Sequence, residues 1–321
     1  MPPQPSPHPH LIAIFGPTAS GKSALALTIS ESFNAEIISA DSRQVYRYMD
    51  IGTDKASPSD QSRVPHHLID IVNPDENYTL GLYQQDAYSA INNILARGLL
   101  PILAGGTPLY INAVLEGWTI PRVEPDPAFR DALYAQAEAD GVAPLYARLT
   151  HLDPKAAAGI LPTNTRRIIR ALEVIHSTGQ LMSAQQAKSA PPYSILGILL
   201  ESDRTTLYKR IDARVDTYIQ RGLVHEVQSL KGRGYPFDLP SMSGIGYRQV
   251  GDYLTGKATL PEAIQRIKYD THAFVRHQVN WFRRHQTANR IDVTTHPPTE
   301  QALQLVRDFL AQHPQSTRNP P

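Results

Sequence analysis

The chain has 321 residues, of which 41% are hydrophobic, and its formal net charge is +1. This length and composition predict a globular protein with a sizeable core, in one large domain with an insertion or in two domains. The chain contains no cysteine, which excludes disulfides, a thiolate nucleophile and a cysteine metal site. No apolar run approaches membrane-spanning length, so we expect a cytoplasmic protein without a membrane segment.

Both ends of the chain are rich in proline and polar residues. The sequence starts MPPQPSPHPH and ends HPQSTRNPP. Such segments have too few apolar residues to bury a core. We therefore expect disordered tails over residues 1–10 and 312–321.

The first motif is GPTASGKS, which lies between the apolar run LIAIF and the helically spaced SALALTISESF. The spacing G-x-x-x-x-G-K-[ST] between a strand and a helix is typical of a phosphate-binding loop. Its backbone N–H groups surround phosphate oxygens, Lys22 adds a positive charge, and the Ser23 hydroxyl ligates Mg²⁺. The sequence therefore predicts a phosphate site with Mg²⁺ as cofactor and Ser23 as its protein ligand. The site consists of Gly16, Pro17, Thr18, Ala19, Ser20, Gly21, Lys22 and Ser23.

Further apolar runs predict buried strands, namely AEIISAD, GLLPILAGGTPLY and SILGILLES, with RIDVT as a weaker candidate. Helical stretches separate them, and this alternation predicts an α/β fold: a P-loop parallel sheet with helices on both faces. Between Trp118 and Pro192 the pattern is helical without a strand, which predicts an all-helical insertion over residues 118–192. The α/β core with its C-terminal helices then covers residues 11–117 and 193–311.

Asp41 follows one of the predicted strands and begins a long polar connection with Ser42, Arg43 and Gln44. Nucleotide-hydrolysing proteins carry an acid at the end of an interior strand, but the interior run GLLPILA is followed here by Gly-Gly-Thr. Two interpretations of Asp41 remain open. It is either a cap of the turn after the strand or a general base beside a bound phosphate.

Two stretches of the chain concentrate positive charge. One is TNTRRIIRALEVIHSTG, with Arg166, Arg167 and Arg170, and the other is the basic and aromatic segment from Arg266 to Arg284. Because the net charge is close to zero, only such local clusters can argue for a nucleic-acid partner. The alternative for each is a solvated helix face.

The motifs GPTASGKS, DSRQVYRYMDIGTDK, PHHLID, GGTPLY, RRIIRALEV and GIGYRQ follow one another in this order. A chain with this series resembles the bacterial tRNA dimethylallyltransferases, and the resemblance extends from Leu11 to Arg284. It implies transfer of a dimethylallyl group from dimethylallyl diphosphate to N6 of the adenosine 3′ to the tRNA anticodon. The phosphate loop would then hold a pyrophosphate leaving group, and no nucleoside triphosphate would be needed.

The resemblance also implies roles for single residues in catalysis. Asp41 matches the aspartate that accepts the N6 proton, and Thr107 matches a threonine near the reacting adenine. Arg214 matches an arginine that contacts the pyrophosphate, and its neighbour Arg210 lies one helical turn away. The alternative for Arg214 is a surface salt bridge to Asp212 or Asp216.

For RNA, the resemblance implies that an anticodon stem-loop binds between the core and the helical insertion, with the target base leaving its stack. We expect the chain to act as a monomer. The residues implied to bind tRNA are Asp41, Ser42, Arg43, Gln44, Thr107, Arg130, Arg166, Arg167, Arg170, Tyr247, Arg248 and Gln249. For Tyr247, Arg248 and Gln249 the alternative is a glycine-bounded turn with a buried tyrosine.

The histidines give little indication of a functional site. His272 and His277 stand where the family has arginines, which weakens the phosphate contacts expected there. His66 and His67 in PHHLID have no partner at metal-ligand spacing, so we expect structural roles.

Three alternative functions are compatible with the phosphate loop and the basic segments. A small-molecule kinase would consume ATP, an adenylate prenyltransferase would modify a free nucleotide, and an RNA-binding module would show no turnover.

Overall fold

The computed structural model describes residues 8–121, 123–185 and 187–314. The chain forms two compact units, which we call the core unit and the helical unit. The core unit comprises Met1–Leu115 and Pro192–Pro321, and the helical unit comprises Glu116–Pro191.

A six-stranded parallel sheet forms the centre of the core unit, with strand order β3-β2-β4-β1-β5-β6. The apolar runs form β1 (His10–Phe15), β2 (Ala35–Ser39), β4 (Leu100–Gly105) and β5 (Ser194–Glu201), and the weaker candidate forms β6 (Asn289–Asp292). The short edge strand β3 (His66–His67) was not predicted, because two histidines carry no apolar pattern. The parallel α/β fold is confirmed.

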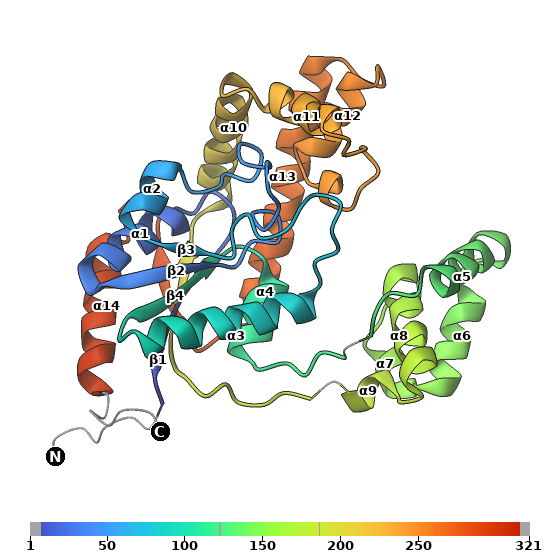
Figure 1. The fold of residues 1–321 in the computed structure, drawn as a ribbon, viewed down its shortest axis with the longest axis horizontal. Helices are drawn as coiled ribbons and strands as arrows, with labels where there is room; N and C mark the ends of the chain where they lie inside the picture. Colours follow the sequence, from blue (N-terminus) through green and yellow to red (C-terminus); the bar gives the residue numbers. More distant parts are fainter. Residues whose placement is uncertain (1–7, 122, 186, 315–321) are drawn as a thin grey trace. The chain divides into compact units, whose positions relative to one another are not determined.

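Helices cover both faces of this sheet (Figure 1). On β1, Ile12 and Ile14 pack in one apolar cluster with residues of α1 (Lys22–Phe33) and α14 (Thr299–Gln312). Leu11, Ala13 and Phe15 point to the opposite face and pack with α3 (Leu80–Ala96) and α4 (Pro108–Leu115). Alternate side chains of a strand point to opposite faces, so a strand apolar at every position must be covered twice.

The C-terminal part of the core unit is a group of helices beside the sheet. It contains α10 (Arg204–Gln220), α11 (Leu223–Gly232), the 3₁₀ turn η1 (Ser241–Ser243), α12 (Tyr247–Leu254) and α13 (Leu260–Phe282). The long helix α13 begins with a capping box: the Thr259 side chain accepts the Glu262 N–H, and the Glu262 side chain accepts the Thr259 N–H. It packs against α10, α12 and α4.

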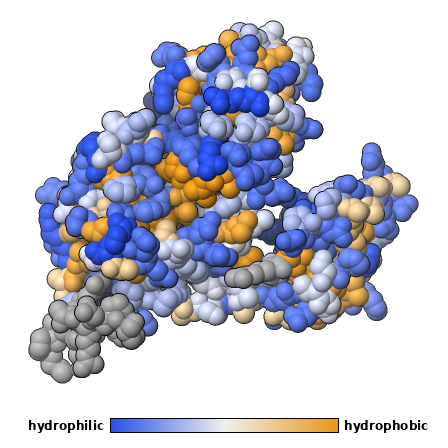
Figure 2. Space-filling view, viewed as in Figure 1, coloured by the Kyte–Doolittle hydropathy of each residue, from blue (hydrophilic) through white to orange (hydrophobic). Residues whose placement is uncertain are grey.

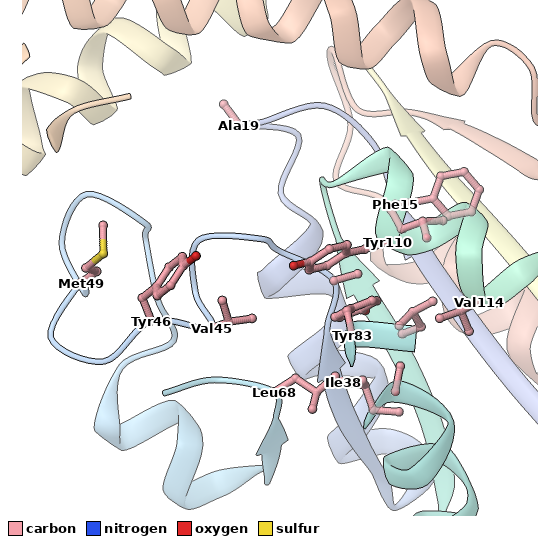
Figure 3. Close-up of a cluster of buried hydrophobic side chains, with 14 of the residues drawn as sticks. Phe15, Ala19, Ile38, Val45, Tyr46, Met49, Leu68, Tyr83, Tyr110 and Val114 are labelled. Carbon is pink, nitrogen blue, oxygen red and sulfur yellow. The ribbon is translucent and has the colours of Figure 1, made fainter. Parts of the chain in front are cut away.

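The polar connection after β2 is fixed to the core by apolar side chains (Figure 3). Val45 and Met49 are fully buried, and Tyr46 is almost so. Beside them in this view the rings of Tyr83 and Tyr110 stack with centroids 3.6 Å apart, and the Tyr83 hydroxyl donates to the Ser39 carbonyl over 3.1 Å. The chain from Asp41 to Lys55 therefore has a defined path, although before α2 (Pro58–Arg63) it forms only turns and an isolated bridge from Tyr46 to Val72.

The helical unit has its own apolar core. It contains α5 (Pro127–Asp140), α6 (Ala143–Leu152), α7 (Pro154–Ala158), α8 (Thr165–Thr178) and α9 (Met182–Gln185). Leu145, Leu149 and Ile168 are fully buried at its centre. A group of helices with a separate core can pack without the sheet.

Regular secondary structure extends into both segments that were expected to be disordered tails. The structure places His10 in β1, where it is 3% exposed and its ring lies 5.1 Å from that of Phe309. At the other end Gln312 completes α14, and the ring of His313 lies 4.9 Å from that of Phe309. The tail boundaries were therefore wrong at His10 and Gln312, because these aromatic contacts join the two ends. Residues 1–7 and 315–321 lie outside the described part.

The helices of the described residues are too short or too polar to cross a bilayer. In the view of Figure 2, the surface of the core unit is mostly hydrophilic, with apolar residues gathered near its middle.

Candidate active site

A pocket of about 370 Å³ lies where the loops after β1, β2 and β4 meet at the carboxyl edge of the sheet. Ligands bind at this edge in open parallel sheets because helix N-termini and loops converge there. Helices α10 and α13 and the Gly244–Gly246 turn supply further walls. Of the residues predicted for the site, the pocket wall contains Thr18, Lys22, Ser23, Asp41, Ser42, Arg43, Gln44, Thr107 and Arg214.

The phosphate loop leads directly into α1. Gly21 precedes this helix with φ 89°, a left-handed conformation that glycine adopts without strain. In this fully described helix, the start has no side-chain cap and the first turn has no acid, so its N–H groups are available to an anion. Within the loop, Ala19 and Ser20 are buried, at 5% and 2% exposure.

Lys22 lies among several charged groups. Its Nζ donates to the Pro17 carbonyl over 2.7 Å. Burial, and next the nearby charge of Arg214, lower the pKa of Lys22 to about 7, although Asp41 and Asp54 oppose the shift. A bound anion would restore the charged form.

Asp41 lies two residues beyond β2 and faces the same pocket. Its Oδ1 accepts the Arg43 N–H over 2.8 Å, so it caps the turn as one interpretation proposed. Burial raises the pKa of Asp41, while the Arg43 N–H and the charge of Lys22 act in the opposite direction. A carboxylate with a raised pKa in a ligand pocket also suits a general base, so the two interpretations are compatible.

Thr107 connects the turn after β4 to the turn after β2. Its Oγ1 accepts the Ser42 N–H over 3.0 Å, and its own N–H donates to the Ala40 carbonyl over 3.0 Å. The two chains approach so closely that a Cβ on Gly105 would lie 2.2 Å from the Ala40 oxygen. Glycine is therefore required at this position to keep Thr107 beside Asp41.

Arg43 and Gln44 line the pocket, but their polar atoms are already paired. Arg43 Nη1 donates to the carbonyls of Pro240 and Ser241 over 2.9 and 3.1 Å. Gln44 Nε2 donates to the carbonyls of Thr53 and Asp54, each over 3.2 Å. In this structure both side chains hold the walls of the pocket together.

Arg214 points into the pocket from α10, and its ion pair differs from the alternative that the sequence offered. Its Nη1 lies 3.0 Å from Asp54 Oδ2. Asp212 and Asp216 instead lie 2.8 Å from His272 and 2.6 Å from Lys268. The neighbour Arg210 donates to the Val293 carbonyl, away from the pocket.

Tyr247, Arg248 and Gln249, which the resemblance implies to bind tRNA, are absent from the described pocket wall, although Gly244–Gly246 directly before them belong to it. Tyr247 is 1% exposed and donates to Glu226 Oε1 over 2.6 Å. Gln249 is 2% exposed, and both Gln249 and Arg248 bond to Asp270. The tyrosine is buried as in the alternative, but the three residues form the first turn of α12, which begins directly after Gly246.

In the helical unit, two of the four predicted arginines bind an internal acid. Glu173 is fully buried and accepts Arg130 Nε over 2.7 Å and Arg170 Nη1 over 2.6 Å. Arg166 and Arg167 on the same helix are exposed. Arg130 and Arg170 therefore neutralise Glu173, whereas Arg166 and Arg167 are exposed cations on the same helix as Glu173.

Two polar residues of the pocket wall, Gln278 and Asp54, make long-range contacts although the sequence interpretation assigned them no role. Gln278 on α13 is 2% exposed, accepts the Thr18 N–H over 2.9 Å and donates to the Gly106 carbonyl over 2.7 Å. Asp54 pairs with Arg214. Asp54 lies in the motif DSRQVYRYMDIGTDK and Gln278 in the basic and aromatic segment from Arg266 to Arg284, but their partners are far away in the sequence. His66 also lines the pocket, whereas His67 pairs with Glu36, His272 stacks on Tyr208, and His277 is exposed.

Two family models match the chain. The model described as IPP transferase matches residues 44–285, and the model described as Isopentenyl transferase matches residues 9–68. A tRNA dimethylallyltransferase of Roseiflexus sp. (strain RS-1) is 53% identical over 300 residues, which cover 94% of this chain and 98% of that protein. One from Thermomicrobium roseum is 50% identical over 88% of this chain and 86% of its own length.

Solved structures are also similar. The tRNA isopentenylpyrophosphate transferase of Bacillus halodurans is 39% identical with a TM-score of 0.70, covering 95% of this chain and 96% of its own. A eukaryotic dimethylallyltransferase acting on tRNA is 26% identical with a TM-score of 0.82, covering 98% of this chain and 82% of its own.

Proposed function

The chain belongs to the IPP transferase family, and from this premise we propose that it transfers a dimethylallyl group from dimethylallyl diphosphate to tRNA. The acceptor is N6 of the adenosine 3′ to the anticodon, and pyrophosphate is released. The observation that carries the proposal is one pocket that contains both the phosphate loop, with Lys22 and Ser23, and the carboxylate of Asp41.

The reaction forms a bond from N6 to the primary allylic carbon and breaks the bond from that carbon to the diphosphate oxygen. Negative charge grows on the leaving pyrophosphate, so the N–H groups of the loop and the charges of Lys22 and Arg214 lower the barrier. The adenine amino group is a poor nucleophile, and Asp41 accepts one of its protons as the bond forms. Thr107 keeps the Asp41 turn in place through the Ser42 N–H.

Mg²⁺ is the cofactor we propose at the loop. Ser23 contributes a hydroxyl to the pocket, and the described residues contain no cluster of three or more His, Cys, Asp or Glu suited to a metal. This donor set fits an ion that takes one protein ligand, phosphate oxygens and water. When bound, Mg²⁺ would neutralise charge on the leaving group.

The RNA substrate is an anticodon stem-loop, and the protein works as a cytoplasmic monomer. Support for RNA comes from the relatives' names and from the exposed Arg166 and Arg167 of the helical unit. A base in a loop costs least to unstack, roughly a few kcal/mol, which suits an anticodon loop.

The direct test incubates the protein with unmodified stem-loop, MgCl₂ and dimethylallyl diphosphate without ATP. We expect the mass of the RNA to rise by one prenyl group, with release of pyrophosphate. Free AMP replaces the RNA in a parallel reaction, and ATP replaces the donor in another. Prenylation of AMP alone would favour the adenylate prenyltransferase, ATP consumption would favour the kinase, and no turnover would favour the binding module.

Donor binding is expected to take up a proton at pH 8, with less uptake as the pH falls toward 6. With a pKa of about 7, Lys22 is largely neutral at pH 8 in the free protein, and a bound diphosphate favours its charged form. Titration calorimetry in buffers of different ionisation enthalpy measures this uptake. Equal heats in every buffer at pH 8 would contradict the assignment of Lys22 to the diphosphate.

Loss of Arg166 or Arg167 is expected to weaken tRNA binding and flatten its salt dependence. Each lost phosphate contact should reduce the slope of log affinity against log salt by about 0.7 to 0.9. Filter binding at several salt concentrations tests Arg166→Ala and Arg167→Ala, after circular dichroism shows that the variants are folded. Arg307→Ala, at an exposed position of α14, is the matched control. Unchanged slopes for both test variants would support the solvated helix face instead.

A further inference from the structure

The pocket contains an acidic residue that the proposed reaction does not use. Asp54 lines the wall together with Lys22 and Arg214. Its Oδ2 lies 3.0 Å from Arg214 Nη1, and its Oδ1 lies 3.9 Å from Arg221 Nη1. The guanidinium that is expected to meet pyrophosphate is therefore paired with an internal anion in the free protein.

The backbone around Asp54 is held in place on both sides. Asp54 has φ 52°, a left-handed conformation that is strained for a residue with a side chain. Gln44 bonds its carbonyl, as described above. Just before it, the Glu226 carboxylate accepts the N–H groups of Asp50, Ile51 and Gly52 over 3.0, 2.8 and 3.3 Å. The backbone that carries Asp54 is thus fixed at the pocket wall.

We propose that Asp54 is the resident counter-ion of Arg214 and competes with the diphosphate for its guanidinium. A phosphate that takes Arg214 from Asp54 leaves an unpaired carboxylate close to an anion, and like charges at short range repel. Asp54 therefore weakens the binding of pyrophosphate and promotes its release after transfer. The competition for Arg214 does not depend on the proposed function. Only the statement that pyrophosphate is a product of the reaction rests on it.

The test measures pyrophosphate affinity by titration calorimetry with MgCl₂ at pH 6, below the pKa of about 7 of Lys22. Asp54→Asn, which keeps the size of the side chain, is expected to bind pyrophosphate about tenfold more tightly, the scale of coupling between contacting residues. Asp54→Gly removes the same charge and suits the positive φ, so it should bind more tightly as well. Asp216→Asn is the matched control, because Asp216 also lies in an ion pair of α10 but outside the pocket wall. Its affinity should stay unchanged.

A double-variant cycle tests whether the effect passes through Arg214. On an Arg214→Gln background, Asp54→Asn should change the affinity much less, and a tenfold difference corresponds to about 1.4 kcal/mol of coupling. Unchanged or weaker pyrophosphate binding in both Asp54 variants, with thermal unfolding like that of the wild type, would overturn the proposal. Weaker binding would mean that Asp54 positions Arg214 instead of competing for it.

The outcome is separate from that of the proposed function. The titrations contain neither RNA nor prenyl donor, so failure of the Asp54 inference would leave prenyl transfer by the wild type untouched. Conversely, absence of prenyl transfer would remove the reaction but not the measured competition for Arg214.

Discussion

The variant Asp41→Asn is expected to lower kcat for prenyl transfer by about 10²-fold or more, the scale of a positioned general base. Asparagine keeps an oxygen that can accept the Arg43 N–H, so the turn after β2 should persist while the proton acceptor is lost. Because burial raises the pKa of Asp41, the wild-type rate should also fall toward low pH as the carboxylate is protonated.

Single-turnover assays with saturating donor and stem-loop measure the effect of Asp41→Asn. Filter binding of tRNA supplies the control and should change little, because the amide occupies the same space. Asp41→Ala loses the turn cap as well and shows what that contact adds. Turnover like that of the wild type in Asp41→Asn would remove Asp41 from the chemistry.

The second large effect is expected at the phosphate loop. Lys22→Ala and Ser23→Ala should each reduce kcat/KM by roughly 10² to 10³, since each removes a group directed at the leaving pyrophosphate. Ser23→Thr keeps the hydroxyl and should be nearly neutral. Initial rates with varied dimethylallyl diphosphate measure these changes.

Two controls accompany the loop variants. Their tRNA affinity should match that of the wild type, because the loop is not assigned to RNA. Calorimetry of the wild type should show tighter binding of dimethylallyl diphosphate than of ATP. The reverse order would support the kinase interpretation.

The sequence was most informative where a signal is local. Each apolar run became a strand, because a strand buried on both faces must be apolar at successive positions. The ordered motifs were sufficient to recognise the family, and the family models and relatives confirm the resemblance. The histidine strand β3 was missed because its pairing with β2 depends on position in the fold and not on hydrophobicity.

Contacts between distant residues could not be predicted in this way. The burial of Val45 and Met49 could not be predicted, because they lie in a polar segment and their burial depends on the packed core. Asp54 and Arg214 are separated by a large part of the chain, so neither sequence neighbourhood indicates their pairing. Glu173 is different, because it follows Arg170 at i+3 on one helix, and this spacing could have indicated their ion pair.

The contact of Gln278 with the phosphate loop has a consequence for synthesis of the protein on the ribosome. Thr18 and Gln278 are 260 positions apart, and the whole helical unit is made between them. Chains emerge from the N-terminus onward, and domains generally fold as units during translation. A nascent chain that ends before Gln278 therefore has the complete phosphate-loop sequence but lacks the amide that fixes it to the turn after β4. The phosphate loop gains this contact only near the end of translation, after the helical unit has had time to fold.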